Sequence, residues 1–173
     1  MRLTTQSTRG MVSAPHHLAA QAGRDVLAEG GGAVEAMVAA AAVIAVVYPQ
    51  MNSIGGDAFW LIHSPDGEDP IAIEACGPAA ALADPAFYAA HRDAAVPSRG
   101  PRAALTMAGT VSGWAEALAL AAERHGARLP VARLLQPAID HARNGVVVSE
   151  GQAKLTREKF DEIKDAPGFV ESY

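Results

Sequence analysis

Residues 30–49 read GGGAVEAMVAAAAVIAVVYP, and this stretch decides the fold. The glycine run interrupts any preceding helix, and Pro49 prevents a helix that reaches it from continuing. Between them, residues 33–47 carry a single charge, at Glu35, and are apolar on nearly every side. A helix of this kind is buried between the layers of a protein. It falls short of the roughly 20 apolar residues that a membrane span requires, so we predict a core helix.

The sequence on either side of this helix predicts a partner helix and a β-hairpin. Residues 16–28 repeat apolar side chains at helical spacing, and Pro15 is expected to occupy the first helical position. Residues 58–63 are rich in aromatic and branched side chains, which favour a strand. Residues 71–75 follow a turn and are expected to form the returning strand.

The rest of the chain is predicted to be mainly helical. Apolar spacing and capping residues indicate helices over residues 84–92, 111–124, 131–143 and 150–164. Together with a short strand expected before Pro15 and the hairpin, these helices define an α/β (α+β) class that is rich in helix. A complete α/β domain contains more strands than this. The chain is therefore predicted to be a fragment whose partner strands lie elsewhere.

Composition excludes several classes of function. Half of the residues are apolar, and the net charge of -5 comes from 19 acidic and 14 basic residues without a basic face, which argues against nucleic acid as a partner. The single Cys76 cannot form an internal disulfide, and the six histidines show no metal-binding spacing. These residue types therefore predict no metal site, and no organic cofactor is expected. Residues 1–10 lack the apolar segment of a secretory signal, so a cytoplasmic location is expected.

Several individual residues have two interpretations each. Gly55 and Gly56 are predicted to let the backbone turn tightly where a Cβ would clash, rather than to contact a substrate. Arg99 and Arg102 either bind an anionic substrate or tie down a loop, and we favour the loop. Trp114 is interpreted as a core anchor for its helix.

Three further side chains are of types that can take part in catalysis. The adjacent His16 and His17 are predicted to point to different helix faces and to serve as caps or surface residues. Cys76 could line a pocket, but without a paired histidine it is not expected to be a nucleophile.

Five blocks of sequence, in this order, resemble the gamma-glutamyltranspeptidase family. The blocks are SAPHHLA at 13–19 with LAEGGGAVEA at 27–36, Pro49 with NSIGGDAF at 52–59, RGP at 99–101, GTVSGW at 109–114, and a last block of Gly126, residues 129–130 and 137–139, Ala142 and Gly145. Gly32 stands where the family has asparagine, Glu35 where it has aspartate, and Ala108 where it has proline. The likeness extends from residue 11 to about residue 149.

The resemblance implies a four-layer αββα sandwich of the N-terminal nucleophile hydrolases, of which residues 1–173 would be the N-terminal segment of the large subunit. In this family a precursor cleaves itself, and the freed threonine of a T-T-H-type motif attacks a γ-glutamyl or related amide. That motif and the small catalytic subunit lie outside this chain, so no catalytic residue is assigned. Thr4 and Thr5 lie before the family's first strand, and no processing signal precedes them, so neither is expected to be the nucleophile.

The implied partners are the remaining large subunit, the small catalytic subunit and a small-molecule amide. The segment alone is expected to be inactive. The alternative is a non-catalytic or truncated product that serves as a folding or partner-binding module.

The resemblance also bears on the substrate. Glutathione-using members hold the substrate α-carboxylate with an arginine four residues before a proline. Counting back from Pro78 places Glu74 there, and a carboxylate would repel that group, which puts glutathione in doubt. A solvated carboxylate at a strand end is the simpler interpretation of Glu74. Residues 74–78 resemble family branches that act on other amides, such as oxamate amidohydrolases or cephalosporin acylases.

Overall fold

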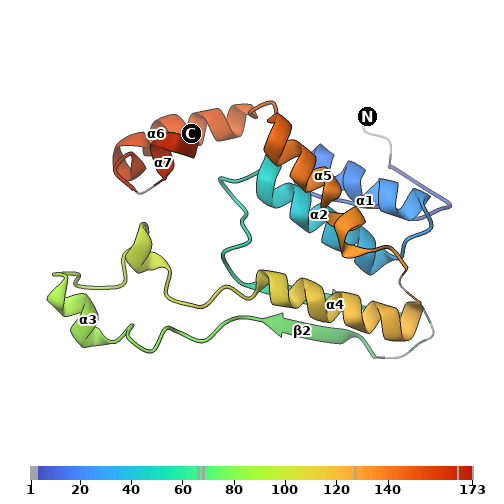
Figure 1. Cartoon of the computed structure of the whole chain (residues 1–173), viewed down its shortest axis with the longest axis horizontal. Coiled ribbons are helices and arrows are strands. Elements are labelled where there is room, and N and C mark those ends of the chain that lie inside the picture. The colour runs from blue at the N-terminus through green and yellow to red at the C-terminus, as the bar shows by residue number, and fades with distance from the viewer. Residues whose placement is uncertain (1–3, 66, 68, 127, 167, 173) are drawn as a thin grey trace.

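The computed structural model describes residues 4–65, 67, 69–126, 128–166 and 168–172, with the side chains of residues 171 and 172 left aside. The elements are α1 (His17–Ala28), α2 (Ala33–Val47), β1 (Ala58–Ile62), β2 (Ile71–Ala75), α3 (Pro85–Ala90), the 3-10 turn η1 (Pro101–Ala103), α4 (Thr110–His125), α5 (Val131–Asn144), α6 (Glu150–Ile163) and α7 (Phe169–Ser172). In Figure 1, α1, α2 and α5 form one bundle, and α4 lies along the hairpin below it. Residues 76–108 form an arm that carries α3 away from both.

Helix α2 is the centre of the core, as its sequence predicts. It packs against α1 and α5 and also contacts α4. Its buried side chains cover all but one stripe of the helix, on which Met37 is exposed. They are mostly alanine and valine, including Val38, Ala39, Val43 and Val47. The small alanine side chains let neighbouring helices approach closely. Within the described part of the chain, no helix is long and apolar enough to span a bilayer.

The carboxylate of Glu35 joins the start of α2 to a distant loop. Glu35 is only 1% exposed to solvent. One oxygen accepts the N–H of Gly32 at 2.7 Å, which caps α2. The other accepts the N–H groups of Arg128 at 2.9 Å and Leu129 at 2.7 Å, just before α5 begins. A buried charge is thereby supplied with three donors, and α5 is held beside α2.

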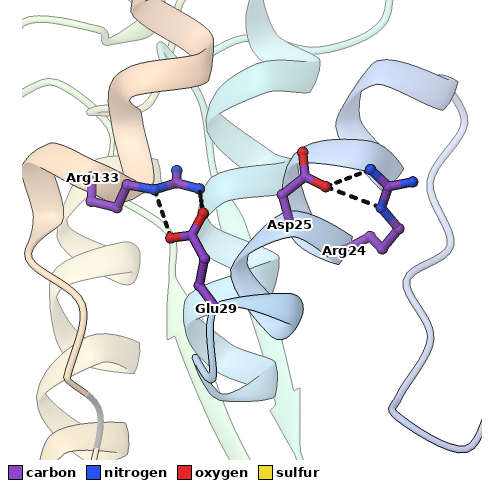
Figure 2. A network of polar contacts seen from close by, with 4 residues as sticks. All are labelled: Arg24, Asp25, Glu29 and Arg133. Atoms are coloured by element: carbon purple, nitrogen blue, oxygen red, sulfur yellow. Dashed lines mark hydrogen bonds and ion pairs between the residues drawn. The ribbon is translucent and has the colours of Figure 1, made fainter.

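An ion pair on the surface reinforces the same arrangement. Glu29 follows α1, and its carboxylate forms a two-pronged pair with the guanidinium of Arg133 on α5, in which Nε lies 2.8 Å from Oε2. Figure 2 shows this pair beside the separate contact between Arg24 and Asp25, which are neighbours on α1. The first of these pairs links two helices, whereas the second lies within one.

The two strands form an antiparallel hairpin in which Phe59 pairs with Glu74. Side chains alternate between its faces. Trp60, Ile62 and Ile73 pack with Ala117 and Ala121 of α4. On the other face, Phe59 and Leu61 are 72% and 78% exposed.

Several predicted boundaries agree with the structure and others do not. Residues 33–47 and 71–75 form the predicted elements, and Ser149 caps α6 by accepting the N–H of Gln152 at 3.2 Å. Helix α7 was not predicted. The strand expected before Pro15 is absent from the described residues, where the sheet contains β1 and β2 alone. Residues before Pro15 therefore lack a neighbouring strand with which to pair.

The start of α1 also differs from the prediction. His16 has an extended backbone and is the N-cap, so the helix begins at His17 and Pro15 precedes the cap. The imidazoles of His16 and His17 do not point apart but stack, with ring centroids 4.6 Å apart. The prediction treated both residues as helical, and the extended φ and ψ of the cap turn the first ring towards the second.

We expect the isolated chain to self-associate, because the hairpin presents an uncovered apolar face and unpaired edges. Replacing both Phe59 and Leu61 by threonine should shift the chain towards monomer in sedimentation velocity, since threonine retains strand propensity. The matched control is Leu82→Thr in the arm, which removes a similarly exposed apolar side chain. A monomeric wild-type chain that unfolds cooperatively, with an m-value appropriate to its length, would contradict this expectation.

Glu35→Gln should lower the free energy of unfolding by about 2 kcal/mol, because an amide nitrogen replaces one carboxylate oxygen and cannot accept a bond from the N–H groups that face it. Urea denaturation at low protein concentration measures this change. Glu116→Gln, on an exposed position of α4, is the control and should be close to neutral. Equal effects of the two substitutions would show that the buried carboxylate contributes nothing specific.

Candidate functional site

The turn before β1 is fastened to the start of α4 by one carbonyl oxygen. Gly56 O accepts the N–H groups of Gly109 at 2.9 Å and Thr110 at 3.0 Å. The hydroxyl of Thr110 donates to the same oxygen at 2.7 Å. Three donors on one acceptor fix the position of residues 55–57 relative to the helix. Sequence reasoning did not single out Thr110, although its place in the GTVSGW stretch at the start of a predicted helix was a usable signal.

Two backbone segments cross at the end of β2 with no room for side chains. A Cβ on Gly77 would lie 2.0 Å from Met107 O, and one on Gly109 would lie 2.1 Å from Ala75 O. Beyond the crossing, the N–H of Met107 donates to Pro78 O at 3.0 Å, which starts the arm. Glycine is required at both positions because any side chain would meet backbone rather than a movable group.

The tight approach predicted for Gly55 and Gly56 is wrong for this structure. A Cβ on Gly56 would meet nothing within 4 Å, and one on Gly55 would meet only the Ser53 hydroxyl at 3.7 Å. Neither residue has a positive φ. The close contacts fall instead on Gly77 and Gly109, whose partners come from other parts of the chain.

Three side chains gather at this end of the hairpin, and we call Asp57, Glu74 and Cys76 the acidic hairpin end. Glu74 is exposed, and the hydroxyl of Thr106 lies 3.4 Å from the Asp57 carboxylate. The strand register places Asp57 and Cys76 directly beyond the Ala58–Ala75 pair, and Glu74 in the pair on its other side. Burial raises the pKa of the Cys76 thiol, and the charges of Asp57 and Glu74 raise it further. The thiol is therefore held in its neutral form and is not an activated nucleophile.

A hollow of about 250 Å³ lies beside the acidic hairpin end. Its polar lining comes from Asn52, Ser53, Asp57 and Thr110, and its apolar lining comes from α2, β1 and Trp114. Trp114 is also buried in the core, as predicted for an anchor. The hollow is open to solvent on one side, so it is one wall of a site rather than a closed pocket.

The two candidate arginines are engaged elsewhere. Arg99 donates from Nε to Glu162 at 2.6 Å and links the arm to α6. Arg102 pairs with Asp93 at 2.5 Å within the arm, and this guanidinium lowers the pKa of the Asp93 carboxyl. Both arginines act as loop ties, which is the interpretation favoured from the sequence. Neither one lines the hollow beside the acidic hairpin end.

The remaining candidates give no catalytic arrangement. Thr4 and Thr5 lie in an exposed segment before α1. His16 caps α1, which is one of the two roles predicted for it. No cluster of metal-binding side chains occurs among the residues that the structure describes.

Comparison with known proteins identifies the class. The structure superposes on the crystal structure of Helicobacter pylori gamma-glutamyltranspeptidase with a TM-score of 0.81 and 28% identity, over 96% of this chain and 46% of that one. The fold is thus part of the αββα sandwich of the N-terminal nucleophile hydrolases. The profile described as Gamma-glutamyltranspeptidase matches residues 19–173. The chain belongs to the gamma-glutamyltranspeptidase family.

Two curated relatives show how far the sequence similarity extends along the chain. The chain is 55% identical to the oxamate amidohydrolase proenzyme of Klebsiella pneumoniae, over 100% of this chain and 32% of that protein. It is 35% identical to the glutathione hydrolase-like YwrD proenzyme of Bacillus subtilis, over 96% of this chain and 30% of that protein. The chain therefore spans about a third of the length of these relatives, as expected for the N-terminal part of a large subunit.

We expect the Cys76 thiol to react slowly with iodoacetamide at neutral pH, because a raised pKa leaves little thiolate. Since the chain contains one cysteine, alkylation followed by mass spectrometry reports this group alone. The pH midpoint of alkylation should lie above that of the same chain in urea. Asp57→Asn should move the folded midpoint downwards. A folded midpoint at or below the unfolded one would contradict the proximity of the carboxylates.

Proposed function

We propose that this chain is the N-terminal segment of the large subunit of a gamma-glutamyltranspeptidase-like amide hydrolase or acyltransferase. The nucleophile would be an N-terminal threonine of the small subunit, outside residues 1–173. Its α-amine would take the hydroxyl proton, and attack on the amide carbonyl would form an acyl-enzyme and release the amine. Water or an acceptor amine would then take the acyl group. This segment supplies a wall of the site rather than the reacting atom.

The similarity to proenzymes supports this proposal. It extends over 96 to 100% of the chain in the two curated relatives. Among the described residues, no observation favours the alternative of a non-catalytic folding or partner-binding module. The partners we propose are the remaining large subunit and the small subunit, which would cover the exposed face of the hairpin.

We infer further that the substrate is a small amide of the oxamate type rather than glutathione. The observation that carries this inference is the acidic hairpin end, where the strand register brings Asp57 and Glu74 to the end that holds Cys76. Arg99 and Arg102 are paired elsewhere. The α-carboxylate of a γ-glutamyl group would be repelled at this end. The 55% identity to an oxamate amidohydrolase proenzyme supports the same substrate class.

Oxamate also carries a carboxylate, but in a different place. Its carboxylate is bonded directly to the amide carbonyl carbon and would lie beside the nucleophile. In a γ-glutamyl amide, the α-carboxylate lies at the far end of the glutamyl chain. We infer that the acidic hairpin end faces the far end of the acyl group and therefore discriminates against the longer substrate.

The test is a comparison of kcat/KM for oxamate, glutathione and a γ-glutamyl anilide with the full-length enzyme. Oxamate should be the best of the three. Glu74→Arg should raise kcat/KM for glutathione by roughly fivefold, the effect of about one surface ion pair, and the neutral Glu74→Gln should raise it less. Arg99→Gln, away from the hollow, is the matched control.

Two outcomes would contradict the proposal. If glutathione is the best substrate, the substrate class is wrong while the family mechanism stands. Residues 1–173 alone should show no turnover, because they lack the nucleophile and most oxyanion donors. Turnover by the isolated chain that disappears in Thr5→Ala would overturn the assignment of the nucleophile itself.

A further inference from the structure

The cap of α1 is a buried histidine. His16 is 9% exposed, and its Nδ1 accepts the N–H of Leu18 at 3.3 Å. Only the neutral imidazole has a nitrogen that can accept a bond, because both ring nitrogens of the cation are donors. This cap therefore exists in one protonation state alone, whereas the usual Ser, Thr, Asp or Asn caps persist across neutral and mildly acidic pH.

The groups around His16 come from all three helices of the bundle. On α1, the ring of His17 stacks on it with a centroid separation of 4.6 Å. Tyr48 at the end of α2 lies with its ring centroid 6.2 Å away. His141 acts on it from α5, and the pKa of His16 is lowered by burial, then by His17 and His141. The positive end of the α1 dipole opposes a charge here as well.

We propose that His16 is a pH-sensitive cap, which uncaps α1 on acidification and loosens the place where α1, the end of α2 and α5 meet. Protonation removes the acceptor for Leu18 N–H and places a charge beside two further imidazoles at a helix N-terminus. The proposal goes beyond the proposed function and does not depend on which amide is cleaved.

The location makes this cap relevant to the candidate site. Tyr48 O accepts the N–H groups of Met51 and Asn52, both at 3.1 Å. Asn52 in turn lines the hollow beside the acidic hairpin end. Loosening at His16 thus acts on the residue from which the chain leaves the bundle and enters the site.

The direction of the pH effect follows from linkage. A histidine whose pKa is lower in the folded state than in the unfolded state binds a proton more readily when the protein is unfolded. The cap makes its full contribution to the free energy of unfolding above the pKa of the unfolded histidine, about 6.5. That contribution is lost as the pH falls through the lower pKa of the folded state. Acidification from neutral pH should therefore release the first turn of α1, and alkaline pH should leave it intact.

The test is hydrogen–deuterium exchange of the full-length polypeptide, followed in peptides from the first turns of α1 at pH 7.5 and 5.5 and corrected for intrinsic exchange rates. In the wild type, protection should fall by about fivefold at pH 5.5, as expected for the loss of one helix cap. His16→Asn retains an acceptor that does not titrate and should keep its protection at both values. His16→Ala should be weakly protected at both. The control is His91→Asn, at the C-cap that follows α3, and it should behave as the wild type.

The same pH change in His16→Asn as in the wild type would overturn the proposal. If His16→Asn does not fold, His17→Asn and His141→Asn provide the second test, because they leave the cap in place and remove the neighbouring charges. Each should shift the midpoint of the wild-type transition upwards, towards the ordinary histidine value, because both imidazoles lower the pKa of His16. A midpoint that neither substitution moves upwards would contradict the role of the cluster.

Discussion

The buried carboxylate of Glu35 is the interaction on which the rest of the structure depends. It caps α2 through Gly32 and, at the same time, accepts two N–H groups from the loop that precedes α5. Burying a carboxylate in an apolar core costs free energy unless hydrogen-bond donors surround it. Glu35 therefore holds the loop before α5 in place as well as the start of α2. With α5 held beside α2, and α1 tied to α5 through Glu29 and Arg133, the bundle becomes one rigid support.

The support positions the candidate site through α2 and α4. The chain leaves α2 at Tyr48, turns beneath the start of α4 at Gly56, and enters β1. The crossing at Gly77 and Gly109 then sends the arm away from the hairpin. Because these contacts are between backbone atoms, the acidic hairpin end is placed by the fold itself rather than by flexible side chains. The hollow, however, is bounded by this segment on one side only, and the proposed partner subunits would complete it.

Much of the candidate site could be predicted from the sequence, but not its close contacts. The interpretation of Arg99 and Arg102 as loop ties is confirmed by their ion pairs, and Glu74 and Cys76 lie at the same end of the hairpin. The roles of the glycines were assigned wrongly, since Gly55 and Gly56 have open space and Gly77 and Gly109 do not. A glycine pair in a sequence signals a turn equally well in both cases. Only the position of the opposing strand or loop shows whether a Cβ would clash.

The sequence by itself determined the bounds of α2, the presence of the hairpin and the cap at Ser149, because each depends on residues that are near one another along the chain. It also determined the family resemblance, because each of the five blocks is a short motif. Apolar periodicity and turn residues act over a few positions, so they can be recognised without coordinates. The tertiary structure alone decided the second set of donors to Glu35, the stacking of His16 on His17 and the burial of the cap. These features join residues that are up to 94 positions apart or depend on one local backbone angle, and no periodic pattern records them.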